Sequence, residues 1–331
     1  MFCPQLTRTK IDKTVKKFLN IISHFFNGYK NTNISSQKLL FVSFSNKKVF
    51  TWLLLILLAF IWGSSFILMK KGLIVFNDLE VAQLRMGIAW LSLLPFVWNK
   101  ITKINKRHIL PIIIVGLFGN GIPAFLFTKA QTQLDSSLVG ILNALVPIFT
   151  FIIAVFLFKN KVKRSQLTGI IIGLCGAVSL IAYGGVNFEN MNYSYYVIAA
   201  TLCYAISLNT IKNSLQDMSA MDISGLAFFV IGPFCLLALY FSEFSYKMQN
   251  SEGAVTALLY IILLSTVGTS VALVAFNVLV KKTTAIFASS VTYLIPIVAI
   301  FWGFMDGEII TWNHFVSIGI ILGGIHLVNK G

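Results

Sequence analysis

Long apolar segments alternate with short polar connections along most of the chain. A transmembrane helix needs about 20 mostly apolar residues to cross a hydrocarbon core of about 30 Å. The pattern predicts ten such helices, at residues 50–69, 79–98, 109–128, 137–158, 167–183, 194–212, 224–242, 254–279, 285–305 and 312–328. No connection is long enough to fold as a separate domain, so the sequence predicts an all-α integral membrane protein.

Composition agrees with this prediction. Hydrophobic residues make up 57% of the 331 residues and charged residues 11%, whereas charged residues make up about 25% of soluble domains. The chain therefore lacks the charges that cover the surface of a soluble protein, which excludes an ordinary soluble enzyme and a disordered protein. The four cysteines form no CxxC pair, so they predict neither a disulfide framework nor a zinc site.

The net charge of +15 follows the predicted membrane topology. With the N-terminus in the cytoplasm, 21 of the 26 lysine and arginine residues lie in inside segments and four in outside loops. Without residues 1–49 the ratio is still 12 to 4. Such a bias is typical of cytoplasmic segments, whereas a nucleic-acid site gathers charge on one folded face. The sequence predicts a multi-pass protein of the bacterial inner membrane, with both termini cytoplasmic and no nucleic-acid partner.

Residues 1–49 form a basic N-terminal tail with nine lysine or arginine residues and one acidic residue, Asp12. Apolar residues recur in it at helical spacing beside lysines, namely Val15, Phe18, Leu19, Ile22 and Phe26. This pattern predicts an amphipathic helix on the anionic cytoplasmic leaflet, with membrane lipid as its partner. The alternative is an extension with no structure of its own.

Several features recur along the chain at a nearly constant separation. An aromatic residue and a lysine eight positions later occur at Trp62 and Lys70 and again 142 residues further on. The pairs separated by 149 residues are Gly119 and Gly268, Phe127 and Phe276, and Pro147 and Pro296. Each copy would hold five helices, an odd number, so the second copy enters the membrane from the opposite side. The sequence thus predicts ten transmembrane helices as two inverted five-helix repeats, at residues 50–183 and 194–330, an arrangement typical of secondary transporters.

Short motifs in both predicted copies resemble EamA-domain proteins of the drug/metabolite transporter superfamily. The opening of the first copy carries Trp62-Gly63-Ser64-Ser65-Phe66 and then Leu84-Arg85, and each copy closes with a proline-containing helix before a glycine-spaced helix. Gly307-Glu308 resembles the Gly-Glu pair of the family, although the first copy has no acid near Lys159-Asn160. The resemblance implies ten helices, inward termini and transport of small metabolites, without a particular substrate.

Arg85 is the one ionisable side chain well inside a predicted span. Burying such a group costs about 2.5–3.5 kcal/mol on insertion scales, so its presence needs a reason. One interpretation is a cationic wall that attracts a carboxylate or phosphate of the solute. The other is a structural arginine that binds helix-end carbonyls, and Glu80, five residues away, is a poor partner. No acid lies at mid-span, which disfavours the proton exchange that small multidrug exporters of the superfamily perform with a buried glutamate.

Neutral polar and aromatic residues near mid-span are the remaining candidates for binding the solute. Together with Arg85, the predicted binding residues are Trp62, Ser64, Ser65, Asn120, Asn143, Tyr204, Ser207, Thr269, Ser270 and Tyr293. Proline frees a helical carbonyl, which predicts hinges at Pro123, Pro147 and Pro296. The two GxxxG runs predict close helix packing at Gly169, Gly173, Gly319 and Gly323, within one chain or between the protomers of a homodimer. For the polar residues, ordinary interhelical hydrogen bonding is the alternative.

These features favour a secondary active transporter that moves a small organic metabolite, amino-acid-like or another small solute, by alternating access between the repeats. The direction is open, with efflux one option. An integral-membrane enzyme would need a cluster of catalytic side chains, and the four histidines fall in different segments. We therefore expect no enzyme, no cofactor and no metal, with a membrane enzyme or a non-transporting scaffold as the alternatives.

Overall fold

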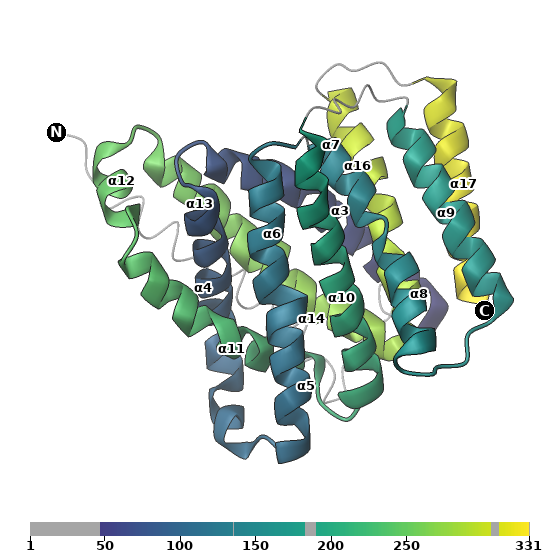
Figure 1. The fold of residues 1–331 in the computed structure, drawn as a ribbon, viewed down its shortest axis with the longest axis horizontal. Helices are drawn as coiled ribbons and strands as arrows, with labels where there is room; N and C mark the ends of the chain where they lie inside the picture. The colour runs from purple at the N-terminus through teal and green to yellow at the C-terminus, as the bar shows by residue number, and fades with distance from the viewer. Residues whose placement is uncertain (1–46, 135, 183–189, 306–310, 331) are drawn as a thin grey trace, which may run out of the picture. The chain divides into compact units, whose positions relative to one another are not determined.

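The structure is a computed structural model that describes residues 47–134, 136–182, 190–305 and 311–330 (Figure 1). Every regular element in these segments is a helix. Up to residue 182 the elements are α3 Lys47–Leu73, α4 Asp78–Val97, η2 Trp98–Lys103, α5 Lys106–Gly116, η3 Leu117–Gly121, α6 Ile122–Gln131, α7 Ser136–Asn143, α8 Val146–Phe156 and α9 Arg164–Ala182. From residue 190 they are η4 Met191–Tyr193, α10 Ser194–Ser214, α11 Ala220–Tyr240, α12 Phe244–Asn250, α13 Ala254–Ser265, η5 Thr266–Val271, α14 Ala272–Lys282, α15 Ala285–Ser289, α16 Val291–Met305 and α17 Trp312–Lys330.

Six helical stretches of the described chain are long and apolar enough to cross a membrane. They are Val49–Leu73, Asp78–Lys103, Lys106–Gln131, Met191–Ser214, Ala220–Tyr240 and Ala254–Lys282. They coincide with the first, second, third, sixth, seventh and eighth predicted helices, whose existence is therefore confirmed. Two shorter apolar helices, Val146–Phe156 and Ala285–Val298, fall within the fourth and ninth predicted helices. The predicted fifth and tenth helices correspond to α9 and α17, each of 19 residues.

The fourth and ninth predicted helices are each divided into two pieces, which corrects the prediction of one continuous helix in each place. In the fourth, Pro147 lies in the first turn of α8, where its missing N–H costs nothing because first-turn donors have no helical partner. The ninth is divided at Ser290, whose Oγ donates to the carbonyl of Phe287 at 2.6 Å. Pro296 lies inside α16, beyond that division.

Polar side chains define where several helices begin. The side chain of Asn77 accepts a hydrogen bond from the Glu80 backbone, and the Glu80 carboxylate accepts one from the Asn77 backbone. This capping box satisfies two donors that a helix start otherwise leaves free. At the start of α11, Ser219 accepts a hydrogen bond from the backbone of Asp222 in the same way.

Helices α9 and α17 lie side by side and pack closely (Figure 1). A Cβ atom on Gly324 would lie 2.5 Å from the backbone nitrogen of Gly173, and one on Gly169 would lie 2.6 Å from the carbonyl oxygen of Gly324. Gly169 and Gly173 therefore lie where α9 and α17 approach each other closely. Gly319 and Gly323 are exposed, with no atom near a Cβ built on them. Within this chain Gly324 takes their place, because a shift of one residue turns a helix face by about 100°.

Residues 51–331 form one compact unit. The predicted amphipathic helix of the tail and the Gly307-Glu308 pair lie outside the described residues. Large apolar side chains on the outside of this unit remain exposed, among them Phe156, Phe234, Tyr240 and Trp312. Exposed apolar area on this scale is typical of a surface that faces lipid.

Candidate functional site, a cavity with one cationic side chain

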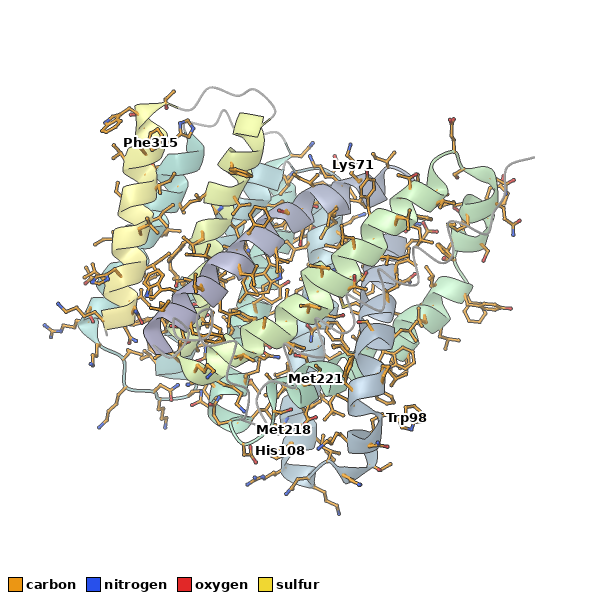
Figure 2. All side chains as sticks on the ribbon, turned by 180° about the vertical axis from the view of Figure 1, so that it is seen from behind. Lys71, Trp98, His108, Met218, Met221 and Phe315 are labelled. Carbon is orange, nitrogen blue, oxygen red and sulfur yellow. The ribbon has the colours of Figure 1, made fainter. Side chains whose placement is uncertain are left out.

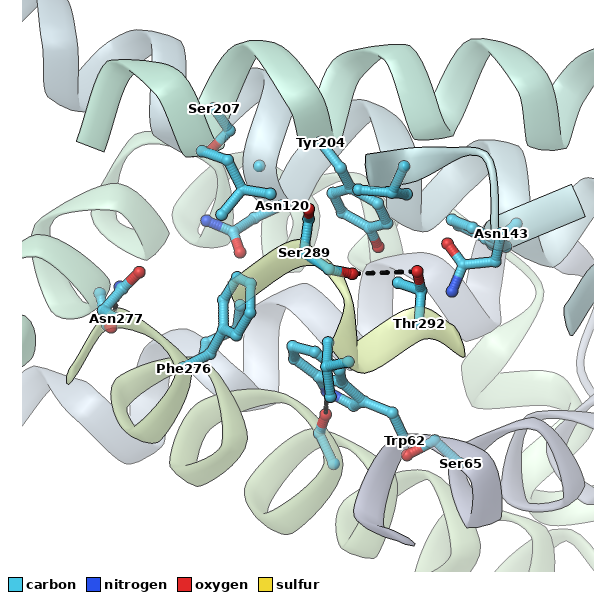
Figure 3. Close-up of a pocket in the computed structure, with 18 of the residues that line it drawn as sticks. Trp62, Ser65, Asn120, Asn143, Tyr204, Ser207, Phe276, Asn277, Ser289 and Thr292 are labelled. Atoms are coloured by element: carbon cyan, nitrogen blue, oxygen red, sulfur yellow. Dashed lines mark hydrogen bonds between the residues drawn. The ribbon is translucent and has the colours of Figure 1, made fainter. Parts of the chain in front are cut away.

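A cavity lies among the helices of residues 51–331 (Figure 3). Its volume is about 120 Å³, counted as the space that the centre of a water molecule can occupy. A single water needs about 10–15 Å³ on this measure, so the cavity has room for several waters or a small organic solute. Its wall combines residues from α3 and α4 near one end of the chain with residues from α14, α15 and α16 near the other.

Seven of the eleven predicted binding residues line this cavity. They are Trp62, Ser65, Arg85, Asn120, Asn143, Tyr204 and Ser207. Figure 3 shows Trp62 of α3 and Tyr204 of α10 on opposite sides of the cavity. Of the predicted hinges, Pro123 lies in the first turn of α6, directly after η3.

The other four predicted residues lie outside the lining and make internal hydrogen bonds. The Tyr293 hydroxyl donates to the carbonyl of Ile170 at 2.9 Å, which ties α16 to α9. The Ser270 hydroxyl lies 2.6 Å from that of Ser92 and joins η5 to α4. Ser64 donates to the carbonyl of Phe60 in its own helix. Thr269 lies outside the lining and accepts a hydrogen bond from Arg85.

Arg85 is the only lysine, arginine, aspartate or glutamate among the described residues that line the cavity. Its Nε donates a hydrogen bond to Thr269 Oγ1 at 2.9 Å, and Thr269 Oγ1 in turn donates to the carbonyl of Leu264 at 3.0 Å. This is the one hydrogen bond that the described chain makes with the guanidinium. Glu80, which the sequence indicated to be a poor partner for Arg85, is paired with Lys247. The two terminal nitrogens of Arg85 are therefore left to bind something other than these residues.

Two π-helical turns, η3 and η5, interrupt long helices beside the cavity. In η3, Asn120 Nδ2 donates to the carbonyl of Val115 at 3.2 Å. In η5, Thr269 makes the corresponding bond to Leu264, also five residues back. Such π-turns often mark functional sites, because they widen the helix and redirect its side chains.

The glycine in each π-turn allows another helix to approach closely. A Cβ on Gly119 would lie 2.3 Å from Ser207 Oγ, and a Cβ on Gly268 would lie 2.6 Å from Ser65 Oγ. Trp62 Nε1 also donates to the carbonyl of Gly268 at 3.1 Å. Ser65 in the first half of the chain therefore approaches Gly268 in the second half. Ser207 in the second half approaches Gly119 in the first half in the same way.

Aromatic pairs cross between the halves in the same manner. The rings of Trp62 and Phe276 meet edge to face at a centroid distance of 5.0 Å, and those of Phe127 and Tyr204 stack at 5.7 Å. All four line the cavity. Their ring faces carry partial negative charge, which suits cationic or apolar parts of a solute.

A buried ion pair and an aromatic contact join the start of α4 to α12 at one end of the helices. Lys247 Nζ lies 2.8 Å from Glu80 Oε2, with side-chain exposures of 18% and 0%. Phe76 and Phe244 pack beside it at a ring-centroid distance of 5.5 Å. Met69 lines the cavity and also belongs to the apolar cluster that includes Phe76.

A second ionic cluster joins the α10–α11 connection to the start of α5. Asp217 pairs with Arg107 and lies 3.1 Å from Nε2 of His108. Burial opposes ionisation of Asp217, but its backbone hydrogen bond and the charges of Arg107 and His108 hold its pKa below the usual range. Figure 2 shows His108 and Met218 at the end of the helices opposite Lys71. The two ionic contacts therefore lie at opposite ends, and the second is the more exposed, with Asp217 at 47%.

Comparison with known proteins agrees with the architecture around this cavity. The model of the EamA-like transporter family matches residues 49–182 and again residues 192–330. The chain belongs to the EamA-like transporter family. Membership in this family and the apolar helices together make it a multi-pass integral membrane protein.

Its relatives include other members named as transporters. The inner membrane transporter YedA of Escherichia coli K12, named as uncharacterized, is 24% identical over 278 residues, covering 82% of this chain and 88% of that protein. A probable amino-acid metabolite efflux pump of Salmonella typhimurium LT2 is 22% identical over 282 residues, covering 83% and 93%. One crystal structure shares the fold with a TM-score of 0.64 at 13% identity, covering 85% of this chain and 96% of that one.

Several residues of the cavity in this EamA-family chain were not predicted as binding residues. They include Phe127, Ser224, Phe276, Asn277, Ser289 and Thr292. The separation of 149 residues carries a signal for three of them, since it relates Phe127 to Phe276 and Asn143 to Thr292. Asn277 and Ser224 form a buried hydrogen bond of 2.8 Å that no sequence pattern indicates. No group of residues suited to a metal ion occurs in the part of the chain that the structure describes.

Proposed function

We propose that this protein is a secondary transporter that moves a small organic solute with a carboxylate, amino-acid-like in size, by alternating access between two inverted five-helix repeats. The observation that carries the proposal is the unneutralised guanidinium of Arg85 in the wall of a solute-sized cavity. The printed name of the Salmonella relative, an amino-acid metabolite efflux pump, is in keeping with such a solute.

The charge arrangement favours an anionic group on the solute. A charge held among apolar helices is costly unless it is paired, and the described lining supplies no carboxylate. A solute carboxylate would supply the missing charge and accept two parallel N–H bonds, the geometry that arginine favours. Thr269 positions the guanidinium through Nε, which leaves the terminal nitrogens for this contact.

The exchanged contacts support two repeats related by a two-fold axis. Residues separated by 142 or 149 positions occupy corresponding places, so that Gly119–Ser207 and Ser65–Gly268 form one pair of equivalent contacts. The family model matches two separate stretches, 49–182 and 192–330, which supports the proposal of two repeats at 50–183 and 194–330. In this proposal spans four and nine are the divided pairs α7–α8 and α15–α16, and spans five and ten are α9 and α17.

A cavity lined by residues of both proposed repeats supports alternating access. The ionic contacts at the two ends, Glu80–Lys247 and Asp217–Arg107, each join one repeat to the other. Separation at one end while the other stays closed would open the cavity to one side of the membrane at a time. The lysine and arginine bias places both termini in the cytoplasm in this scheme.

Reconstitution of the full chain in sealed liposomes tests the proposal. A panel of radiolabelled small carboxylates, amines and neutral solutes is offered under an imposed solute, proton or sodium gradient, with empty liposomes as the control. We expect carrier-mediated uptake of at least one carboxylate, which saturates with concentration and is accelerated by the same solute on the far side. If no member of the panel moves under any gradient, the proposal is wrong.

A further inference from the structure

Asn120 lines the cavity and carries a side-chain oxygen that has no hydrogen-bond partner among the described residues. The residue is 6% exposed and lines the cavity. Its Nδ2 donates to the carbonyl of Val115 at 3.2 Å, whereas its Oδ1 is buried with no hydrogen-bond partner in the described chain. A buried acceptor without a donor is unfavourable, so this atom calls for a donor that the described residues do not supply.

The orientation of the Asn120 amide follows from its surroundings. If the amide were turned over, its oxygen would face the Val115 carbonyl, and two acceptors would oppose each other. The oxygen is therefore the amide atom that lacks a hydrogen-bond partner among the described residues. At the corresponding place in the other π-turn, Thr269 donates to Leu264 and accepts from Arg85. One turn thus orients the cation of the site, and the other holds a free acceptor.

We propose that Asn120 Oδ1 accepts a hydrogen bond from an ammonium or amine group of the solute and thereby favours amine-bearing solutes. This rests on the proposed function, in which Arg85 binds the solute carboxylate. A simple cation would be repelled by Arg85, and no acid among the described lining residues compensates. A solute with both a carboxylate and an ammonium group satisfies both ends of the site, because an ionised donor gives a stronger hydrogen bond.

The surroundings of Asn120 suit an ammonium group. The aromatic rings of Trp62 and Tyr204 line the same cavity as Asn120. Ring faces attract ammonium groups by the cation–π interaction. Because Oδ1 is covered in this conformation, the solute reaches it through small side-chain displacements, which are common on binding.

Matched pairs of solutes that differ only in the amine test this proposal. Proteoliposomes with the full chain are given L-leucine or L-2-hydroxyisocaproate, and L-phenylalanine or L-3-phenyllactate. The variant Asn120→Thr keeps the residue type that the other π-turn carries. The control is Asn209→Thr, since Asn209 also donates Nδ2 to backbone carbonyls and has a buried unpaired Oδ1, but does not line the cavity.

We expect wild-type protein to prefer the amino acid over the hydroxy acid by about tenfold or more in kcat/KM. Asn120→Thr should reduce this ratio to about threefold or less while hydroxy-acid transport persists, which shows that the variant is folded. Asn209→Thr should keep the wild-type ratio. The inference is overturned, with the proposed function intact, if hydroxy acids are transported as well as amino acids or if Asn120→Thr keeps the preference. Failure to transport either member of every pair would overturn both.

Discussion

The buried ion pair between Glu80 and Lys247 should set how readily that end of the cavity opens. The substitution Glu80→Gln removes the charge but keeps a side chain that can accept the backbone hydrogen bond of the capping box. It therefore changes the contact to α12 more than the start of α4. Lys247 is left with Glu243, which lies 3.6 Å away and is 75% exposed.

The magnitude follows from the burial of the pair. Removing one partner of a buried ion pair costs about 3–5 kcal/mol, because the other charge stays buried. In the open state both side chains meet water, so the penalty applies mainly to the closed state. At about 1.4 kcal/mol for each factor of ten, the open population at this end should rise by roughly two to three and a half orders of magnitude, until opening is no longer limiting.

The assay measures access to Met69, which lines the cavity and belongs to the same apolar cluster as Phe76. The four native cysteines are replaced, Met69→Cys is introduced, and a membrane-impermeant maleimide is added to each side of the proteoliposomes separately. Glu80→Gln should raise the labelling rate from the side that α12 faces by at least about 30-fold. This threshold lies below the smallest rise expected for the open population.

Two further variants decide the interpretation. Glu243→Gln removes an exposed i,i+4 partner of Lys247, an interaction of about 0.5 kcal/mol or less, and should leave labelling within about threefold. The double variant Glu80→Gln with Lys247→Met should label more slowly than Glu80→Gln, because it no longer buries an unpaired charge. The reasoning is refuted if Glu80→Gln and Glu243→Gln label equally fast.

Three other substitutions test contacts in the fold. Gly119→Ala should lower stability by about 1–3 kcal/mol through overpacking, measured by thermal unfolding in detergent, and Ser207→Ala should restore much of it because the clash is with the hydroxyl at 2.3 Å; no recovery would contradict the contact. Gly324→Ala should be destabilising, since its Cβ would meet backbone at 2.5 Å, whereas Gly323→Ala should be tolerated, and the reverse order would contradict the packing of α17. Tyr293→Phe should lose about 1 kcal/mol of stability and keep transport, since the hydroxyl bonds to backbone; loss of transport in a stable variant would return Tyr293 to the site.

The apolar pattern predicted the long helices because length and hydropathy are local properties of a segment. It missed the divisions near Pro147 and at Ser290, because a short break in an apolar run hardly changes mean hydropathy. The tenth helix shows a similar limit. Its sequence contains Gly319, Gly323 and Gly324, and which of them faces α9 depends on helix rotation that spacing alone does not fix.

The site was partly predictable because polar residues within apolar spans are few. Arg85, Asn120 and Asn143 stand out in such segments, and all three line the cavity. The side on which a polar residue points was not predictable. Ser270 and Tyr293 are just as rare in their surroundings, yet each bonds to a neighbouring helix. Contacts between the two halves of the chain, such as that of Trp62 with Phe276, could not be predicted either, because they depend on how the helices pack in three dimensions.

Transport by Arg85 variants tests the central claim most directly. The carboxylate solute found in the liposome panel is measured in wild-type protein, Arg85→Gln and Arg164→Gln, which removes an exposed arginine at the start of α9. Loss of hydrogen bonds to a charged group costs about 1.5–3 kcal/mol, so Arg85→Gln should reduce kcat/KM by about 10- to 150-fold, and Arg164→Gln should match the wild type. Normal transport of the carboxylate by correctly folded Arg85→Gln protein would contradict the account.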